Sequence, residues 1–329
     1  MRIARVTACM TVFIVATMAL FVAVSLIAVA QDSYPNRPIK IIVPLPPGAT
    51  ADTLPRIVAD KLTLRWGQPV IVENRSGAAN NLGAEMVAQA KPDGYTLLAT
   101  PPGPLVIAQS LYSDLAFEPT AFVPVTVLAA IPNMLVARAS LPAANIAELV
   151  AYAKANPDKL NYASGGVGTT PHLAAEALQI AAGIRMVHIP YKGLAPALTD
   201  LLAGHVDLMF DNIGNIIQHV KAGTIKGLAV ASTERLPELP DVPALAETYP
   251  GFYSTTWFAI VAPPQTPPEI AVKLSRAIAE IIKMPDVAEE FRRLSCIPVG
   301  NSPAEMAVFL KEEAERWHKV IMTAGIKPE

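Results

Sequence analysis

Cysteine, charged residues and basic tracts are all scarce in this chain. Its 329 residues include two cysteines, Cys9 and Cys296, and only 16% of them are charged. The formal net charge is -2 and there is no run of Lys and Arg, which argues against nucleic acid as a partner. If the N-terminal segment with Cys9 is removed, Cys296 has no partner and no internal disulfide can form. We therefore expect Cys296 to be a small residue of the core.

Residues 1–30 have the pattern of a signal peptide. Arg2 and Arg5 give a positively charged start, a long apolar run follows, and residues 28–30 (Ala-Val-Ala) fit a cleavage site. We expect cleavage, because the run ends in small residues and no basic stop-transfer flank follows. The run is long for a signal peptide, so an uncleaved anchor, which would make the chain a membrane-anchored sensor domain, is the alternative. No stretch after residue 30 approaches the length that spans a bilayer.

The segment after residue 30 alternates between strand and helix patterns. Residues 39–45 are a β-branched apolar run typical of a buried strand, and Asp52 is placed to cap the helix that follows. A second strand is expected at 69–73, a helix after the small-residue loop 75–81, and a third strand at 95–100. This order predicts an α/β fold with a parallel sheet, in which ligands bind at the carboxyl ends of the strands.

Residues 161–183, reading NYASGGVGTTPHLAAEALQIAAG, combine a strand end, a glycine loop and a helix. Thr170 is expected to cap this helix, with Pro171 at the first helical position and Gly183 as a left-handed C-cap. The unpaired amides of a helix N-terminus attract anions, and the loop hydroxyls add donors without any Lys or Arg. The stretch therefore predicts a carboxylate site. An ordinary turn whose glycines serve only close packing is the alternative.

Several patterns complete the expected fold. Strands and helices alternate again between residues 146 and 232, so a second unit repeats the β/α order. Residues 122–138 read as two strand pieces around Pro132. The sequences Thr266-Pro267-Pro268-Glu269 and Ser302-Pro303-Ala304-Glu305 read as capping boxes, and the second opens a final helix that reaches about residue 324.

Ser164 suggests a different chemistry, because Tyr-Ala-Ser-Gly-Gly resembles the nucleophile elbow of serine hydrolases. Asp211 and His219 follow as a candidate acid and base, but their spacing is far too short for that fold. A serine hydrolase using Ser164 is therefore the alternative to a binding function. His172 and Glu176 lie one helical turn apart without a third metal ligand at matching spacing, and no nucleotide motif is complete, so no metal or cofactor is expected.

Six stretches of the chain carry a resemblance to a known family. They are YPNRPIKIIVPLPPGATAD, QPVIVENRSGAANNLGAEMVAQAKPDGYTLL, NYASGGVGTTPHLAAEAL, HIPYKGLAPALTDLLAGHVDLMF, GLAVASTERLPELPDVPALAE and WFAIVAPPQTPPEI. In these stretches the chain resembles the Bug, or tripartite tricarboxylate receptor, family of periplasmic solute-binding proteins. The resemblance implies a two-domain Venus-flytrap fold of the type II periplasmic-binding class. Domain I is then expected at 34–134 and 256–329, and domain II at 135–255.

The resemblance also assigns ligand contacts, position by position. They lie in the loop after the first strand, in the loop that opens the second helix, in the serine-glycine loop and at one strand end. These residues are Pro47, Gly48, Ala49, Thr50, Asp52, Gly77, Ala78, Ala79, Asn80, Ser164, Gly165, Gly166, Gly168, Thr169, Thr170, His172 and Asp211. Asp211 either selects a ligand ammonium group or caps the following helix. The family usually has glycine at the positions of Ala49 and Ala79, so the added methyl groups are expected to narrow the pocket.

We therefore predict an exported, periplasmic receptor that binds a small carboxylate, an organic acid or an amino acid, and is not an enzyme. The expected partners, implied by the resemblance alone, are the membrane permease subunits of a tripartite tricarboxylate transporter. A signalling role is left open, because many family members lack an adjacent permease. The receptor is expected to be a monomer that closes on its ligand by hinge bending.

Overall fold

The computed structural model describes residues 34–48 and 50–328. The predicted signal peptide, Cys9 and Ala49 lie outside the described residues. Within the described ranges, no helix is both long and apolar enough to cross a membrane. Cys296 is a buried, free thiol, as expected.

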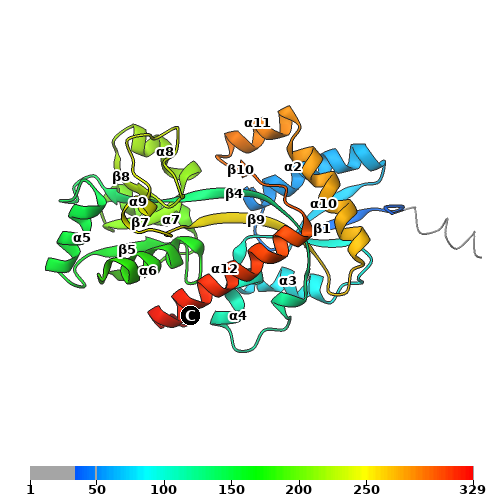
Figure 1. Cartoon of the computed structure of the whole chain (residues 1–329), viewed down its shortest axis with the longest axis horizontal. Coiled ribbons are helices and arrows are strands. Elements are labelled where there is room, and N and C mark those ends of the chain that lie inside the picture. The colour runs from blue at the N-terminus through cyan, green and yellow to red at the C-terminus, as the bar shows by residue number, and fades with distance from the viewer. Residues whose placement is uncertain (1–33, 49, 329) are drawn as a thin grey trace, which may run out of the picture.

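Figure 1 shows two lobes joined by two long strands. In the first lobe, β1 pairs in parallel with β2 and β3, and β9 pairs antiparallel with β3. Its first elements are β1 (Ile39–Val43), α2 (Thr50–Trp66), β2 (Val70–Asn74), the 3-10 helix η2 (Ala78–Asn80), α3 (Asn81–Ala88), β3 (Thr96–Thr100), the π-helical segment η3 (Gly103–Ile107), α4 (Ala108–Leu111) and the 3-10 helix η4 (Pro119–Ala121). The chain returns to this lobe through β9 (Thr255–Ala262), α10 (Pro268–Ile282), α11 (Pro285–Arg293) and β10 (Ile297–Pro298), and ends in α12 (Pro303–Ala324).

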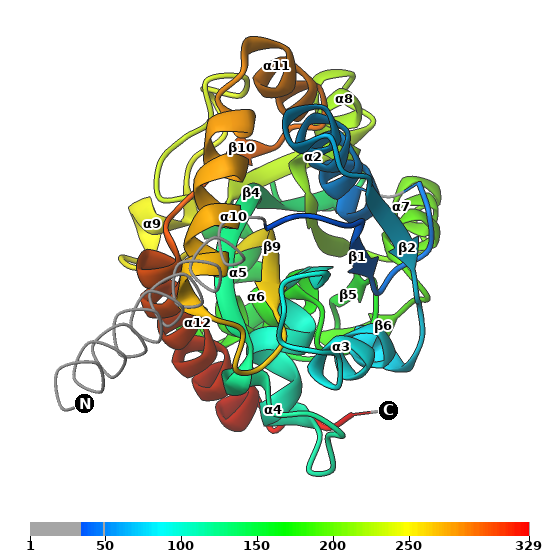
Figure 2. The same ribbon diagram turned by 90° about the vertical axis from the view of Figure 1, so that its right-hand side faces the viewer.

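The alternation of side chains along β1 explains why helices cover both faces of this sheet. Ile41 and Val43 belong to the core cluster that includes residues of α2 and α10, whereas Ile42 lies in the cluster with residues of α3 and α12. Figure 2 shows the two helix layers above and below the strands. A strand that is buried on both faces needs a continuous apolar sequence, and four of the five β1 residues are buried.

The second lobe repeats this arrangement with a parallel set of strands. Here β5 pairs in parallel with β6 and β7, and β8 pairs antiparallel with β4. Its elements are α5 (Ile146–Ala155), β5 (Asn161–Ser164), α6 (Thr170–Ala182), β6 (Val187–Pro190), α7 (Leu194–Ala203), β7 (Leu208–Asn212), α8 (Ile213–Lys221), β8 (Ile225–Val230) and α9 (Leu245–Thr248).

Strand β4 (Val123–Arg138) belongs to both lobes. Up to Pro132 it pairs with β9, and from Asn133 onward it pairs with β7, joined one residue later by β8. The prediction of two strand pieces around Pro132 was therefore wrong, because one strand continues through the proline. Proline lacks an N–H, but it lies where β4 changes partners, so the missing donor interrupts neither ladder.

Helix α12 contacts both lobes. It packs on β4 and η3 and also against α6 of the second lobe, and Figure 1 shows it running from the first lobe toward α6. Its start confirms the predicted capping box, because Ser302 Oγ accepts from Glu305 N and Glu305 accepts from Ser302 N. The capping box predicted at Thr266 was wrong. Helix α10 begins at Pro268 with Pro267 as N-cap, and the Thr266 hydroxyl donates to Pro263 O at 2.8 Å.

Two further helix starts differ from the sequence predictions. Helix α2 begins at Thr50, so Asp52 lies inside its first turn and is not its N-cap. Helix α6 includes Thr170 and has Thr169 as N-cap, without a side-chain capping bond. Gly183 does form the predicted left-handed C-cap, with φ 61° and ψ 46°.

Candidate functional site

A cavity of about 1170 Å³ lies between the lobes, at the carboxyl ends of β1, β3, β5 and β7. Its lining contains ten of the residues predicted to contact a ligand. They are Gly48, Thr50, Ala78, Ala79, Asn80, Gly165, Gly166, Gly168, Thr169 and Thr170. Six others do not line the cavity, namely Pro47, Asp52, Gly77, Ser164, His172 and Asp211. The structure thus brings the loops of both lobes together and places several of their polar side chains behind the cavity wall.

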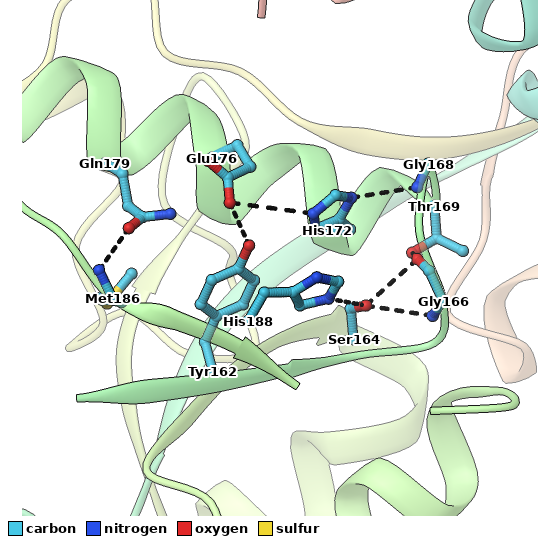
Figure 3. A network of polar contacts seen from close by, with 10 residues as sticks. All are labelled: Tyr162, Ser164, Gly166, Gly168, Thr169, His172, Glu176, Gln179, Met186 and His188. Atoms are coloured by element: carbon cyan, nitrogen blue, oxygen red, sulfur yellow. Dashed lines mark hydrogen bonds and ion pairs between the residues drawn. The ribbon is translucent and has the colours of Figure 1, made fainter. Parts of the chain in front are cut away.

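The glycine loop between β5 and α6 is held from behind by two buried side chains (Figure 3). Ser164 Oγ accepts a hydrogen bond from Gly166 N at 3.2 Å. His172 Nδ1 accepts one from Gly168 N at 3.1 Å. Both glycines have positive φ, 127° and 77°, so these amides point in directions that other residues rarely allow. Neither amide is therefore left for a ligand.

The loop hydroxyls are also engaged within the protein. Thr169 Oγ1 donates to Gly166 O at 2.8 Å, and Thr170 Oγ1 lies 2.6 Å from Thr256 Oγ1 of β9. In the glycine loop and the first turn of α6, the amides of Val167, Thr170 and His172 have no hydrogen-bond partner within the described part of the chain. These are the donors that the N-terminal end of α6 offers to an anion.

Behind the loop, three aromatic rings are stacked. The ring centroids of His172 and His188 lie 4.0 Å apart, and those of His188 and Tyr162 lie 4.8 Å apart. His188 Nε2 is 2.7 Å from Ser164 Oγ. Tyr162 donates to Glu176, whose Oε1 lies 3.9 Å from His172 Nε2. Figure 3 shows two sets of polar contacts behind the loop, one from Tyr162 through Glu176 and His172 to Gly168 and one from His188 through Ser164 to Gly166.

Burial sets the charge of these rings. Desolvation, with a smaller contribution from His188, lowers the pKa of His172 to about 3. Desolvation also lowers the pKa of His188 to about 4. Both imidazoles are therefore neutral at pH 7. Burial likewise raises the pKa of Glu176, although the hydrogen bond from Tyr162 opposes this shift.

In the first lobe, Asp52 has the same kind of role as Ser164 and His172. Its buried carboxylate accepts from Gly48 N at 3.0 Å, from Arg56 Nε at 3.0 Å and from Asn74 Nδ2 at 2.9 Å. The bond from Arg56 is the main reason that the pKa of Asp52 falls to about 2. Asp52 therefore stays ionised and holds the loop that precedes α2.

The loop before α3 has an unusual backbone. Ala78, Ala79 and Asn80 all have positive φ, at 46°, 50° and 75°. Alanine is disfavoured in this region by about 1–2 kcal/mol, because its Cβ approaches the following carbonyl oxygen. Strained residues of this kind cluster at binding sites, and all three line the cavity.

An apolar wall, formed by residues 101–117, was not predicted as part of the site. Ile107, Leu111 and Phe117 of this segment line the cavity. A Cβ added at Gly168 would lie 2.5 Å from Leu111 Cδ1, so the wall touches the glycine loop of the other lobe. The loop after β3 was expected at the ligand edge, but nothing in its sequence marked it as a contact. The charged residues of the lining are Glu85 and Asp114, and no Lys or Arg of the described chain belongs to it.

The residues proposed for a serine hydrolase do not meet. Asp211 Oδ1 accepts from Asn212 N and from Asn215 Nδ2, and His219 lies against Thr224. Ser164 is fully buried, and its histidine neighbour is His188 rather than His219. Asp211 is also buried, and desolvation raises its pKa to about 7. The predicted catalytic set was therefore wrong.

Comparison with known proteins places the chain in a family. Residues 54–326 match the profile described as the tripartite tricarboxylate transporter family receptor, TctC. The chain belongs to this family. Among its curated relatives is Protein BugT of Bordetella pertussis, which is 36% identical over 319 residues that cover 95% of this chain and 98% of BugT. The resemblance seen in the six sequence stretches is confirmed.

Solved structures of similar chains confirm the two-lobed α/β fold of periplasmic binding proteins. R. palustris Rpa4515 with adipate gives a TM-score of 0.79 at 36% identity and covers 90% of this chain and 100% of its own. The periplasmic binding protein BugD gives a TM-score of 0.76 at 35% identity, and the match covers 90% of this chain and 100% of BugD. MatC from Rhodopseudomonas palustris with bound malate gives a TM-score of 0.75 at 33% identity, and the match covers 88% of this chain and 100% of MatC. The TctC family is one of solute-binding receptors, and these similarities give a serine hydrolase no support.

Proposed function

We propose that this chain is an exported, periplasmic receptor that binds a small carboxylate between its lobes and is not an enzyme. The observation that carries the proposal is the position of α6, whose unpaired N-terminal amides open on a cavity without Lys or Arg in its described lining. Such a helix end binds anions through backbone N–H groups and its dipole. The adipate of Rpa4515 and the malate of MatC, both carboxylates held by similar chains, support this choice of ligand.

The ligand is proposed to close two domains, I (34–134 and 256–329) and II (135–255), with its anionic group at the mouth of α6. The shared strand β4 and its partner β9 are where the lobes connect, which supports these boundaries. The loaded receptor, a monomer, would then deliver the ligand to the membrane permease subunits of a tripartite tricarboxylate transporter. The family description supports this partner.

A thermal-shift screen tests the function. Adipate, malate, benzoate and glutamate are compared with adipamide, which has the shape of adipate but no charge. A carboxylate present at a hundredfold excess over its Kd should stabilise the protein by about 2.7 kcal/mol. Adipamide should give no shift, because it offers the helix end no negative charge. The absence of a shift with every acid, or chemical conversion of an acid that binds, would refute the proposal.

A further inference from the structure

Ser164 and His172 lie behind the glycine loop and not in the cavity lining. Their polar atoms accept hydrogen bonds from Gly166 N and Gly168 N. Both side chains are almost completely buried, with 0% and 3% of their surface exposed. They cannot touch a ligand without displacing the loop, so whatever they do for binding they do through its backbone.

The bond from Gly168 N fixes the state of the His172 ring. An atom that accepts an N–H bond carries no proton, so Nδ1 must be bare and the ring proton must lie on Nε2. Nε2 faces Glu176 Oε1 at 3.9 Å. A proton on Nδ1 would set two donors against each other and would push Gly168 away from α6. The loop therefore requires one particular tautomer of a neutral histidine.

Ser164 and His188 complete the support. Ser164 Oγ lies 2.7 Å from His188 Nε2, and the His188 ring is stacked on His172 at 4.0 Å. The titratable groups packed around the two rings are Tyr162 on β5 and Glu176 on α6, and these two are hydrogen-bonded to each other. The stacked histidine rings thus link the two acceptors, Ser164 Oγ and His172 Nδ1, that hold the amides of Gly166 and Gly168.

We propose that His172, backed by His188 and Ser164, is a positioning residue that fixes the glycine loop so that the free amides of Val167 and Thr170, which line the cavity, converge on the ligand anion. This inference rests on the proposed function, because that proposal supplies the negatively charged ligand. It assigns a role to the buried side chains of Ser164 and His172 and to the half-buried ring of His188. The role depends on the acceptor at Nδ1 and not on the bulk of the ring.

Two substitutions separate the acceptor from the ring. His172→Phe keeps an aromatic ring in the stack and removes the acceptor. His172→Asn removes the ring but places an oxygen at the position of Nδ1. His205→Phe is the control, because His205 is exposed and lies away from the cavity. Each variant is compared with the wild-type protein for amide hydrogen exchange of residues 164–170 and for adipate affinity.

In His172→Phe the loop amides should exchange at least about tenfold faster and adipate should bind about tenfold more weakly, as expected when one hydrogen bond is lost. His172→Asn should recover most of both effects, and His205→Phe should leave both unchanged. Imidazole ¹⁵N shifts of the wild-type protein at pH 7 should show His172 neutral with its proton on Nε2.

Three results would overturn the inference: the other tautomer, unchanged loop exchange in His172→Phe, or an Asn variant no better than the Phe variant. The exchange and tautomer measurements need no ligand. If wild-type protein bound no acid at all, the receptor proposal would fail, and these two measurements would still decide whether His172 holds the loop.

Discussion

At Gly168 the glycine loop is constrained by both lobes. Its φ of 77° lies in the left-handed region, its N–H is held by His172, and an added Cβ would meet Leu111 of the first lobe. Gly183 makes a useful contrast, since its φ of 61° is also left-handed but a Cβ added there would have no atom within 4 Å. Gly168 thus differs from Gly183 in its contact with the cavity wall, in its hydrogen bond to His172 and in lining the cavity.

Gly168→Ala should therefore weaken ligand binding, whereas Gly183→Ala should only destabilise the fold. Backbone strain at either position costs about 1–2 kcal/mol of unfolding free energy. At Gly168 the Leu111 side chain must also move, so adipate affinity should fall by about tenfold or more, which corresponds to roughly 1.4 kcal/mol. Urea unfolding and calorimetry measure the two quantities. Equal loss of affinity in both variants would show that the wall contact is unimportant.

At the scale of elements, the junction of β4 with β9 is a buried polar cluster. Asn133 Nδ2 donates to Asn212 Oδ1 at 3.0 Å and to Thr256 Oγ1 at 3.2 Å, and Asn133 Oδ1 accepts from Ser254 Oγ at 3.0 Å. Asn133 and Ser254 are almost fully buried. Asn133 therefore connects strands of both lobes at the point where the chain passes between them.

Asn133→Ala should lower the unfolding free energy by about 1–3 kcal/mol per buried partner left without a hydrogen bond. A double-mutant cycle with Ser254→Ala isolates one of these bonds. The two single effects should exceed the effect of the double variant by roughly 0.5–1.5 kcal/mol, because the second substitution removes an interaction that is already broken. Strictly additive effects, measured by urea unfolding, would contradict this account.

Much of the fold could be predicted where one local signal decides the structure. Ser302 and Glu305 sit at capping-box spacing around a single proline, and the box forms. At Thr266 two prolines follow in succession, the helix starts at the second, and the threonine is one residue too early to cap it. The continuity of β4 through Pro132 depends on which strands lie beside it, and a local pattern does not contain that information.

The candidate site was predictable in its loops but not in its wall. Glycine loops before helices carry a recognisable sequence, and Gly48, Gly166 and Gly168 do line the cavity. The direction of a side chain relative to the loop is a tertiary property, so His172 was expected in the pocket and lies behind it. The wall around Leu111 is apolar, and an apolar sequence looks the same whether it faces a core or a ligand.

For the molecule as a whole, ionisable groups removed from solvent change stability with pH in two directions. The histidines make the protein more stable as the pH rises, and Asp211 makes it less stable. The neutral histidines contribute stability that is complete above pH 6.5, the unfolded value, and is lost as the pH falls toward the folded pKa values of about 3 for His172 and about 4 for His188. Asp211, whose pKa is raised to about 7, acts the other way. Its contribution is present below the unfolded value of 3.8 and is lost as the pH rises toward 7.

Asp211→Asn should therefore change the slope of stability against pH. Between about pH 4 and pH 7, ionisation of Asp211 lowers the unfolding free energy of the wild-type protein by up to roughly 1.4 kcal/mol per pH unit. The variant has no such carboxyl group, so its stability should rise more steeply with pH than that of the wild-type protein. The slope is the informative quantity, because the added amide also introduces a buried donor that shifts all values alike. Urea unfolding at several pH values measures it, with the exposed Asp158→Asn as control. Parallel curves for Asp211→Asn and wild type would exclude a raised Asp211 pKa.

The way the chain enters and leaves the second lobe has a practical consequence. Asn133 N donates to Ser254 O at 3.2 Å, so the departure point on β4 and the return point, one residue before β9, are neighbours. The second lobe is therefore an insert whose two ends lie side by side. The sheet of the first lobe would not need to shift to accept the second lobe of another receptor. Exchanging the second lobe between homologous receptors is thus a route to chimaeras with new ligand preferences, because each parent receptor contributes one lobe and with it one side of the cavity.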